Sequence, residues 1–375
     1  MAKFEDQLKG ISQREFISEK MSLVFHELNK KFNFIDRISI ALYDNQCDTL
    51  TTYIHCSKDA SPLNHYQAKL GDSKSLQQIA CSGEPRIIND MSVYDTVKKH
   101  HSIQIKKGGF KSSYTYPIYN RGLFYGFIFI NSGQLNAFSD EVLAVMSPLA
   151  HLIAAFTIIE FSDIQTLTAT VTTALEMTHQ RDPETGEHLS RMARYSRLIA
   201  LEVASKYQMD DEAIEHIFLF APLHDVGKIS IPDSILLKPG RLDETEFEQM
   251  KSHCARGLEI INKILSNYKL DHRPHINILK NIVRHHHEKI NGSGYPDGLA
   301  GNAIPIEARI VAVADVFDAL TSKRPYKEAW SNQNAYAELE RLSGEELDED
   351  CVNALLKDKH EIEQIQLRFQ EDYIG

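Results

Sequence analysis

The chain has 375 residues, of which 42% are hydrophobic and 25% charged. This composition excludes a largely disordered protein, and the length predicts two or three domains. The formal net charge of −11 argues against a general nucleic-acid binder, whose domain would normally be basic. Five scattered cysteines without a CxxC pair favour a reducing compartment, and the first residues are not typical of a signal peptide, so we expect a cytoplasmic protein.

The first third of the chain alternates short apolar runs with turn residues, which is typical of strands joined by hairpins. The last two runs flank Asn120-Arg121-Gly122, a turn that favours a tight hairpin. A long helix is expected to begin at Ser139, which can serve as its N-cap. Strands are expected at residues 37–43, 49–55, 86–88, 111–119 and 122–130, with a short helix at 75–81. This order predicts an α+β domain, an antiparallel sheet flanked by helices.

Residues 15–157 resemble a GAF domain. Three segments carry the resemblance: the strand SIALYD, the turn Ser82-Gly83-Glu84-Pro85, and the hairpin YPIYNRGLFYGFIFINS that leads into FSDEVLAVMSPLAHLIA. The resemblance implies a sensor domain for an unknown small ligand that regulates the rest of the chain. A scaffold for dimerisation without a ligand is the alternative.

Residues 142–159 are almost wholly apolar and about long enough to span a bilayer. They contain Pro148 and His151, and no Lys or Arg occurs between Gly122 and Gln180, whereas a membrane span usually carries basic residues at one end. We therefore expect a buried or dimer-facing helix and no membrane insertion.

Residues 158–178 predict a helical connector with an apolar stripe at heptad-like spacing. Such a stripe is expected of a helix that pairs with a second copy of the chain, and we predict a homodimer. A single helix packed on its own domain is the alternative. The stripe consists of Ile164, Leu167, Val171, Ala174 and Thr178, with Phe161, Thr168 and Leu175 beside it.

Residues 166–350 predict an all-helical domain that concentrates imidazoles and carboxylates. His224 and Asp225 follow an apolar helical run and precede Gly227, which we expect to be a C-cap. Neighbouring His and Asp at a buried helix end can bind different faces of a metal cluster, and a carboxylate can bridge two cations about 3.5–4 Å apart. Residues 351–375 are expected to form a charged, solvated helix or tail without a catalytic role.

Further candidate ligands lie downstream and upstream of this pair. Asp315 interrupts an apolar stretch, where an unpaired carboxylate would be costly; pairing with Arg309 or Arg324 is the alternative to a metal. Glu184 and His188 are four residues apart and share one helix face, so they could add a third ion. Next to the adjacent His286 and His287, Glu288 is available to orient an imidazole. The remaining histidines are expected to be structural or exposed: His100, His101, His179, His216, His272, His275 and His285, which should pack outward.

Residues 166–350 resemble the HD-GYP phosphodiesterases. The motifs appear in the family's order: His224-Asp225-Val226-Gly227-Lys228, His253, His286-His287-Glu288, Gly292-Ser293-Gly294-Tyr295-Pro296, and the run from Asp315 through Arg324-Pro325-Tyr326. The resemblance implies an all-α HD-domain bundle that holds two or three divalent ions, iron or manganese rather than zinc, and that hydrolyses cyclic di-GMP to pGpG or GMP.

The resemblance also implies a role for each matching residue. Asp225, which would bridge two ions, and Lys228 would be catalytic. The implied metal ligands are Glu184, His188, His224, Asp225, His253, His286, His287 and Asp315, and the implied substrate-binding residues are Lys228, Gly294, Tyr295, Arg324 and Lys327. A solvated Lys228 and a purely structural Tyr295 are the alternatives.

One departure concerns the loop before Gly292. The family usually has Trp-Asp-Gly there, whereas this chain has Ile290-Asn291-Gly292, which removes an acceptor and puts loop geometry and substrate preference in doubt. A phosphodiesterase for another cyclic dinucleotide, such as cyclic GMP-AMP, is one alternative function. A catalytically silent module that binds the messenger is another, against which the complete set of ligand positions argues.

Overall fold

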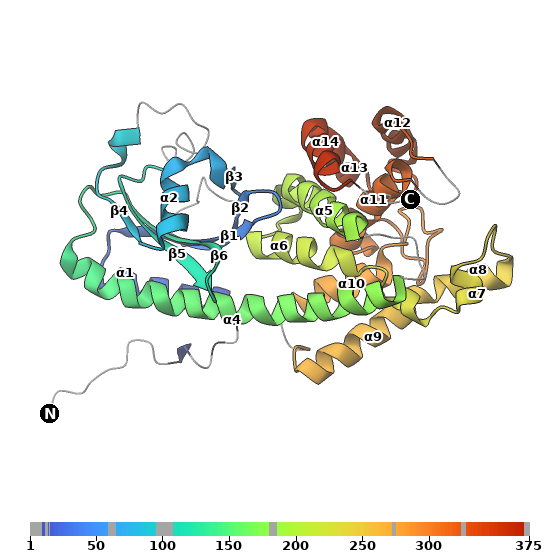
Figure 1. The fold of residues 1–375 in the computed structure, drawn as a ribbon, viewed down its shortest axis with the longest axis horizontal. Helices are drawn as coiled ribbons and strands as arrows, with labels where there is room; N and C mark the ends of the chain where they lie inside the picture. The colour runs from blue at the N-terminus through green and yellow to red at the C-terminus, as the bar shows by residue number, and fades with distance from the viewer. Residues whose placement is uncertain are drawn as a thin grey trace. The chain divides into compact units, whose positions relative to one another are not determined.

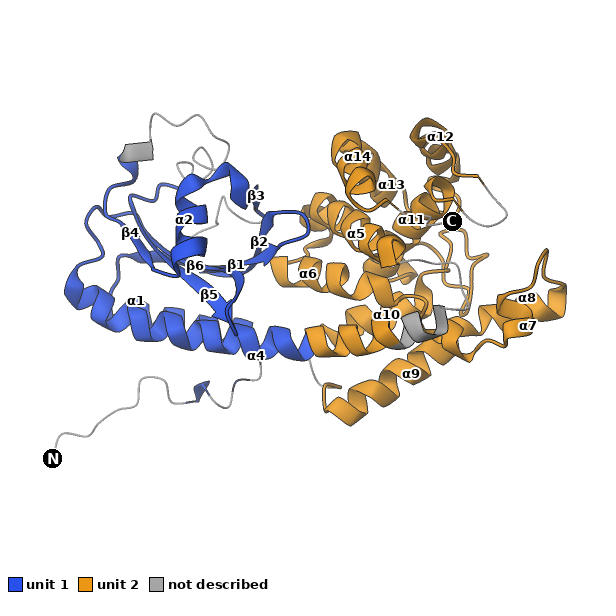
Figure 2. Cartoon of the chain, viewed as in Figure 1, with its two compact units in different colours: residues 1–164 blue, residues 165–375 orange. Residues whose placement is uncertain are grey.

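The computed structural model describes residues 10–11, 14, 16–58, 65–94, 108–179, 186–271, 275–323 and 328–370, with side chains from Ala174 to His179 left out. The chain divides into two compact units, residues 1–164 and 165–375 (Figure 2). The predicted α+β fold of the first and helical fold of the second are confirmed.

Six strands of unit 1 form one antiparallel sheet in the order β3-β2-β1-β6-β5-β4 (Figure 1). The turn between β5 and β6 has positive φ at Arg121 (51°) and Gly122 (83°), as a two-residue hairpin requires, and this confirms the predicted hairpin. The predicted strands are all present, and the three-residue β3 was missed because it is too short to show an alternating pattern. The strands are β1 (Ile35–Asp44), β2 (Thr49–Ser57), β3 (Gln67–Lys69), β4 (Arg86–Ile88), β5 (Ser112–Asn120) and β6 (Leu123–Ser132).

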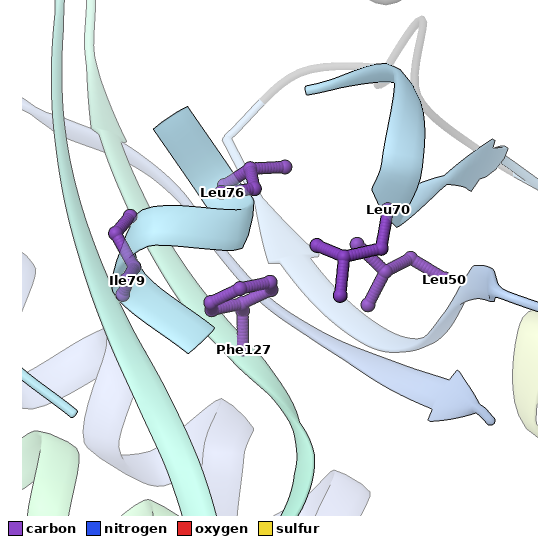
Figure 3. Packing of buried hydrophobic residues seen from close by; sticks show 5 residues of the cluster. All are labelled: Leu50, Leu70, Leu76, Ile79 and Phe127. Atoms are coloured by element: carbon purple, nitrogen blue, oxygen red, sulfur yellow. The ribbon is translucent and has the colours of Figure 1, made fainter. Parts of the chain in front are cut away.

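Helices of unit 1 cover this sheet. In α2, the Ser73 hydroxyl caps the first turn by accepting the N–H of Leu76, and Gly83 ends the helix with φ of 75°. Figure 3 shows the apolar side of α2 against the sheet, where Leu50, Leu70, Leu76, Ile79 and Phe127 pack together. The helical elements are α1 (Ile17–Lys31), η2 (Leu70–Asp72), α2 (Lys74–Ser82), η3 (Met91–Tyr94) and the start of α4 (Asp140–His179).

Helix α4 begins one residue after Ser139, as predicted, and its first part runs beside α1 (Figure 1). The buried Glu160 accepts the backbone N–H of Ile17, the first residue of α1, at 3.0 Å. By length and composition, residues 140–173 could cross a membrane, and 33% of their most apolar window is buried inside the chain.

The connector stripe is not an open pairing face. Ile164, Leu167 and Val171 are 4%, 0% and 1% exposed in the single chain, so the alternative of packing within one chain accounts for them. Residues farther along the stripe, from Ala174 onward, have side chains outside the described part. The exposed apolar positions of α4 lie on another face and include Ile159, which is 60% exposed.

Unit 2 is helical throughout its described residues, apart from one isolated bridge between Ser343 and Leu347. Helix α5 lies at its centre and packs against α6, α11 and α13. Its elements are α5 (Gly186–Tyr207), α6 (Asp211–Phe220), η4 (Ala221–Leu223), η5 (Val226–Ser230), α7 (Asp233–Leu236), α8 (Glu244–Lys251), α9 (His253–Tyr268), α10 (Ile276–His285), η6 (Gly301–Ala303), α11 (Ile306–Thr321), α12 (Asn332–Leu342), α13 (Glu349–Lys357) and α14 (Lys359–Arg368).

The expectation of a solvated C-terminal helix is wrong. Two helices, α13 and α14, pack against α5, and Leu355 and Ile362 are fully buried. The charged residues that suggested a solvated tail alternate with apolar ones at helical spacing, so each helix buries one face.

Candidate metal centre

Five segments of unit 2 bring seven of the eight predicted ligands together. His188 comes from α5, His224 and Asp225 from the break between η4 and η5, and His253 is the first residue of α9. His286 and His287 directly follow α10, and Asp315 lies within α11. The eighth residue, Glu184, lies outside the described residues.

The seven side chains form two adjacent groups. In each group the candidate ligand atoms lie within 4.8 Å of one another: Asp225, His253, His286 and His287 in the first, and His188, His224 and Asp315 in the second. Asp225 joins the groups, because its Oδ2 lies 3.0 Å from Nε2 of His224 and its Oδ1 lies 3.2 Å from Nε2 of His253. Each carboxylate oxygen therefore faces a different group, an arrangement suited to a bridge between two ions.

Hydrogen bonds fix the tautomer of four imidazoles. In each, Nδ1 donates to an oxygen, which leaves Nε2 with its lone pair in the neutral ring. The donor–acceptor distances are 2.7 Å from His188 to the Asp318 carboxylate, 2.9 Å from His224 to the Ala221 carbonyl, 2.7 Å from His253 to the Met250 carbonyl and 3.0 Å from His286 to the Ile282 carbonyl. These rings are thus prepared to bind a metal through Nε2.

The buried polar atoms at the junction fit a divalent ion. Nε2 of His286 and Oδ1 of Asp225 are buried, and neither has a hydrogen-bond partner among the described residues. Unsatisfied buried polar atoms are costly, and a cation between them would remove the cost. The set of nitrogen and oxygen donors without sulfur is typical of a divalent metal site rather than a thiolate zinc site.

Charge at the junction also favours binding of cations. Burial opposes ionisation of Asp225, but the Lys228 ammonium and the His224 imidazole hold its pKa well below the usual range. Burial lowers the pKa of His253 to about 4, and burial also holds the pKa of His287 well below its usual range. The carboxylate is therefore charged and these imidazoles neutral at neutral pH, as metal ligands must be.

Lys228 lies beside the bridging carboxylate. Its Nζ is 2.9 Å from Oδ2 of Asp225, and its side chain is 17% exposed. The alternative of a fully solvated lysine does not describe this position. An ammonium held here lies beside the candidate metal ligands and is still partly open to solvent.

Asp318, which the sequence analysis missed, orients His188. This fully buried carboxylate accepts His188 Nδ1 at 2.7 Å and Arg191 Nε at 2.6 Å, and the Ser322 hydroxyl lies 3.0 Å away. Burial opposes its ionisation, yet the hydrogen bonds from His188 and Arg191 lower its pKa to about 2. One signal was available: Asp318 follows Asp315 by one helical turn, and His188 and Arg191 have the same spacing.

At two motif positions another backbone segment lies so close that only glycine fits. A Cβ at Gly227 would lie 1.8 Å from the carbonyl oxygen of His253, and one at Gly294 would lie 2.6 Å from the carbonyl oxygen of His287. Gly227 lies inside η5, so the expectation that it caps a helix is wrong. Its role is to let the segment carrying Asp225 contact the start of α9.

The loop with Gly294 and Tyr295 lies against the first ligand group. The N–H of Tyr295 donates to the His287 carbonyl at 3.2 Å, and the two rings are 4.8 Å apart. The Glu288 carboxylate accepts the backbone N–H groups of Asp297 (2.7 Å) and Leu299 (3.0 Å). The expectation that Glu288 orients an imidazole of the centre is therefore wrong, and its role is to hold the loop.

Asn291 has one acceptor oxygen fewer than an aspartate, but its remaining oxygen still holds the loop. Its side-chain oxygen accepts the N–H and the hydroxyl of Ser293 at 2.9 Å and 2.7 Å, so this loop hydrogen bond does not need an aspartate.

Arg309 and His285 have acidic partners away from the centre. Arg309 pairs with Asp348 at 2.7 Å, which excludes it as the partner that would explain Asp315 without a metal. His285 does not join the centre, and its Nδ1 lies 3.5 Å from Oδ2 of Asp297. Arg324 and Lys327, predicted to bind phosphate, lie outside the described residues.

Comparison with known proteins agrees with this geometry. Residues 183–351 match the family model described as HD domain. A cyclic di-GMP phosphodiesterase response regulator, RpfG, from Xanthomonas campestris pv. campestris is 47% identical over 185 residues, 49% of this chain and 46% of that protein. A 3'3'-cGAMP-specific phosphodiesterase 2 from Vibrio cholerae is 42% identical over 177 residues, 47% of this chain and 32% of that protein. The chain spans about half or less of the length of these curated relatives.

Unit 1 has structural neighbours with low scores. The GAF domain of an Acinetobacter phosphoenolpyruvate-protein phosphotransferase matches with a TM-score of 0.32 and 11% identity, covering 41% of this chain and 89% of that one.

Proposed function

We propose that the chain is a metal-dependent phosphodiesterase that hydrolyses cyclic di-GMP to pGpG or GMP. The observation that carries this proposal is the position of Asp225 between two groups of candidate ligands, in which four of the five imidazoles donate Nδ1 to an oxygen and so present Nε2. The names of the relatives of the HD domain supply the substrate class.

Seven described residues would hold the ions, with Glu184 as the predicted further ligand. They are His188, His224, Asp225, His253, His286, His287 and Asp315. Ions bound here would act as Lewis acids and make a hydroxide nucleophile available near neutral pH. The resemblance to the HD-GYP phosphodiesterases makes iron or manganese the expected occupant, and the absence of sulfur ligands agrees with a site that is not of the thiolate zinc type.

The other residues of the site would bind and position the dinucleotide. Lys228 would place its ammonium on a phosphate oxygen or on the departing oxygen, where charge develops. The half-buried ring of Tyr295, next to His287, offers a surface for guanine, and Gly294 lets the loop approach. Arg324 and Lys327 would contact the second phosphate, Arg324 through its planar fork.

The test combines metal analysis and product identification on one anaerobically purified sample. Asp225→Ala should lose bound metal and turnover of cyclic di-GMP, whereas Asp350→Ala, which removes a carboxylate that pairs with Lys206, should keep both. Full turnover by Asp225→Ala would end the proposal. Loss of activity with unchanged metal content would show that the residue acts without holding the ions.

A second substrate is supported by one comparison. The relative named as specific for 3'3'-cGAMP is 42% identical over 177 residues, so cyclic GMP-AMP belongs in the same assay. Faster turnover of cyclic GMP-AMP than of cyclic di-GMP by the same metal-loaded sample would change the substrate but keep the chemistry. Tight binding of messenger by metal-free protein without any turnover would favour a silent binding module.

We also propose that unit 1 senses a small ligand and regulates unit 2 within a cytoplasmic homodimer. Helix α4 is continuous from one unit into the other, and Ile159 leaves an apolar side chain exposed on it. Deleting residues 1–155 should change both oligomeric state and activity. Unchanged values of both would remove the regulatory role.

A further inference from the structure

A second cluster of metal-ligating side chains lies in unit 2, apart from the centre around Asp225. It consists of Glu212 and His216 on α6 and His275, the residue before α10. Their candidate ligand atoms lie within 4.8 Å of one another. The two residues on α6 are one turn apart and share a helix face, which brings both toward the start of α10.

The distances within this cluster suit a tetrahedral ion. Oε1 of Glu212 lies 3.3 Å from Nε2 of His275. Two ligand atoms bound at about 2.0–2.1 Å on neighbouring corners of a tetrahedron are about 3.3 Å apart. Nδ1 of His216 donates to the Glu212 carbonyl oxygen at 2.7 Å, so the lone pair of the neutral ring is on Nε2. The His216 and His275 rings lie side by side, with centroids 4.5 Å apart.

The Glu212 carboxylate is buried, so its negative charge requires a nearby cation or hydrogen-bond donors. Glu212 is 5% exposed and His216 is 3% exposed. Oε1 of Glu212 is buried and accepts no hydrogen bond from the described residues, although His275 lies within ion-pair distance. A buried carboxylate oxygen is costly unless a cation or donors compensate it.

In a similar cluster elsewhere in unit 2, the carboxylates already have hydrogen-bond donors. His285, Glu288 and Asp297 also bring three candidate ligands together. There, Glu288 accepts two backbone N–H groups of its loop, and Asp297 accepts the fork of Arg284 through both oxygens at 2.7 Å. These carboxylates are already occupied, so that cluster is not a comparable site.

We propose that Glu212, His216 and His275 form a separate site for one divalent transition-metal ion, for which Zn²⁺ is the best match. Two imidazoles and one carboxylate are a common zinc ligand set, with a fourth position left for water on the side where His275 is partly exposed. The site is distinct from the centre around Asp225, because α10 separates them: its ten residues span about 15 Å.

An ion at this site would clamp the two helices that lead to the catalytic ligands. Helix α6 continues through η4 to His224 and Asp225, and α10 ends directly before His286 and His287. Tying the start of α6 to the start of α10 would restrict both segments. The expected role is zinc-dependent stabilisation of the HD domain, independent of the reaction it performs.

The test counts bound ions in the full-length protein after equilibration with Zn²⁺ and desalting. Glu212→Gln and His275→Gln keep side-chain size and should each bind one ion fewer than the wild type, whereas His360→Gln, which removes an exposed histidine on α14, should bind the same number. The zinc-induced rise in Tm should be about 5–10 °C smaller in both variants, the shift for an ion at a hundred times its Kd.

Three outcomes would overturn the proposal. Equal zinc counts in wild type and variants, together with a Tm lowered to the same extent with and without zinc, would leave Glu212 and His275 as an ion pair only. Loss of more than one ion would place the effect at the centre around Asp225. A zinc count in His216→Gln equal to that of the wild type would exclude the His216 imidazole as a ligand. If His216→Gln does not fold, the zinc count of His275→Gln tests the site instead, because the His275 side chain is 20% exposed and its replacement should be tolerated.

Discussion

Replacing Asp318 with asparagine tests how the structure holds His188. The carboxylate accepts one hydrogen bond from His188 and two from Arg191, at 2.6 Å and 3.0 Å. Asparagine has nearly the same shape but no charge, and its amide group would face one of these donors with its own N–H. The change therefore leaves a buried guanidinium without its counter-ion.

Two magnitudes follow from this geometry. Breaking a buried ion pair by removing one partner costs about 3–5 kcal/mol of unfolding free energy. Removing the partner that orients a metal-binding imidazole lowers metal affinity about 10- to 100-fold. The loss should fall on the ion held by His188, His224 and Asp315, while the ion held by His253, His286 and His287 stays.

The assays are metal titration and urea unfolding of Asp318→Asn. The matched control is Ser322→Ala, which removes one hydroxyl that contacts the same carboxylate and should cost only about 1 kcal/mol. Wild-type affinity for every ion in Asp318→Asn would refute the orienting role. A fall in stability alone would show that the carboxylate serves Arg191 and not His188.

Three further predictions concern the centre. Gly227→Ala should lower the free energy of unfolding by about 3 kcal/mol or more, because its Cβ would lie 1.8 Å from the His253 carbonyl oxygen. The control is Gly186→Ala, where nothing lies within 4 Å of the added Cβ, and its free energy of unfolding in urea should be nearly unchanged. Equal losses of stability in the two variants would contradict this prediction. Lys228→Met should keep bound metal and lose about a hundredfold in kcat, measured with cyclic di-GMP, and unchanged kcat would remove its catalytic role. In metal-free protein, folding lowers the pKa of His253 from 6.5 to about 4. Its stabilising contribution is therefore complete above pH 6.5 and lost as the pH falls toward 4, by about 3 kcal/mol. Urea unfolding across this range should show a steeper loss in the wild type than in His253→Gln, and parallel curves would contradict it.

The sequence by itself determined the segments and their chemistry. Alternating apolar residues and the Asn120-Arg121-Gly122 turn identified the hairpin of unit 1, because strand period and turn conformation are local properties. The histidines and aspartates of the motifs were recognisable as candidate ligands because their chemistry and short-range spacing do not depend on the rest of the fold.

Only the tertiary structure decided which side chains meet. His188 and Asp318 are 130 positions apart and form a buried hydrogen bond, and Glu212 meets His275 because α6 packs against α10. The C-terminal helices are buried although their composition is polar, since a single apolar face is enough to pack against α5. Sequence periodicity shows that a helix has a face to bury, but the packing of distant helices determines what lies opposite that face.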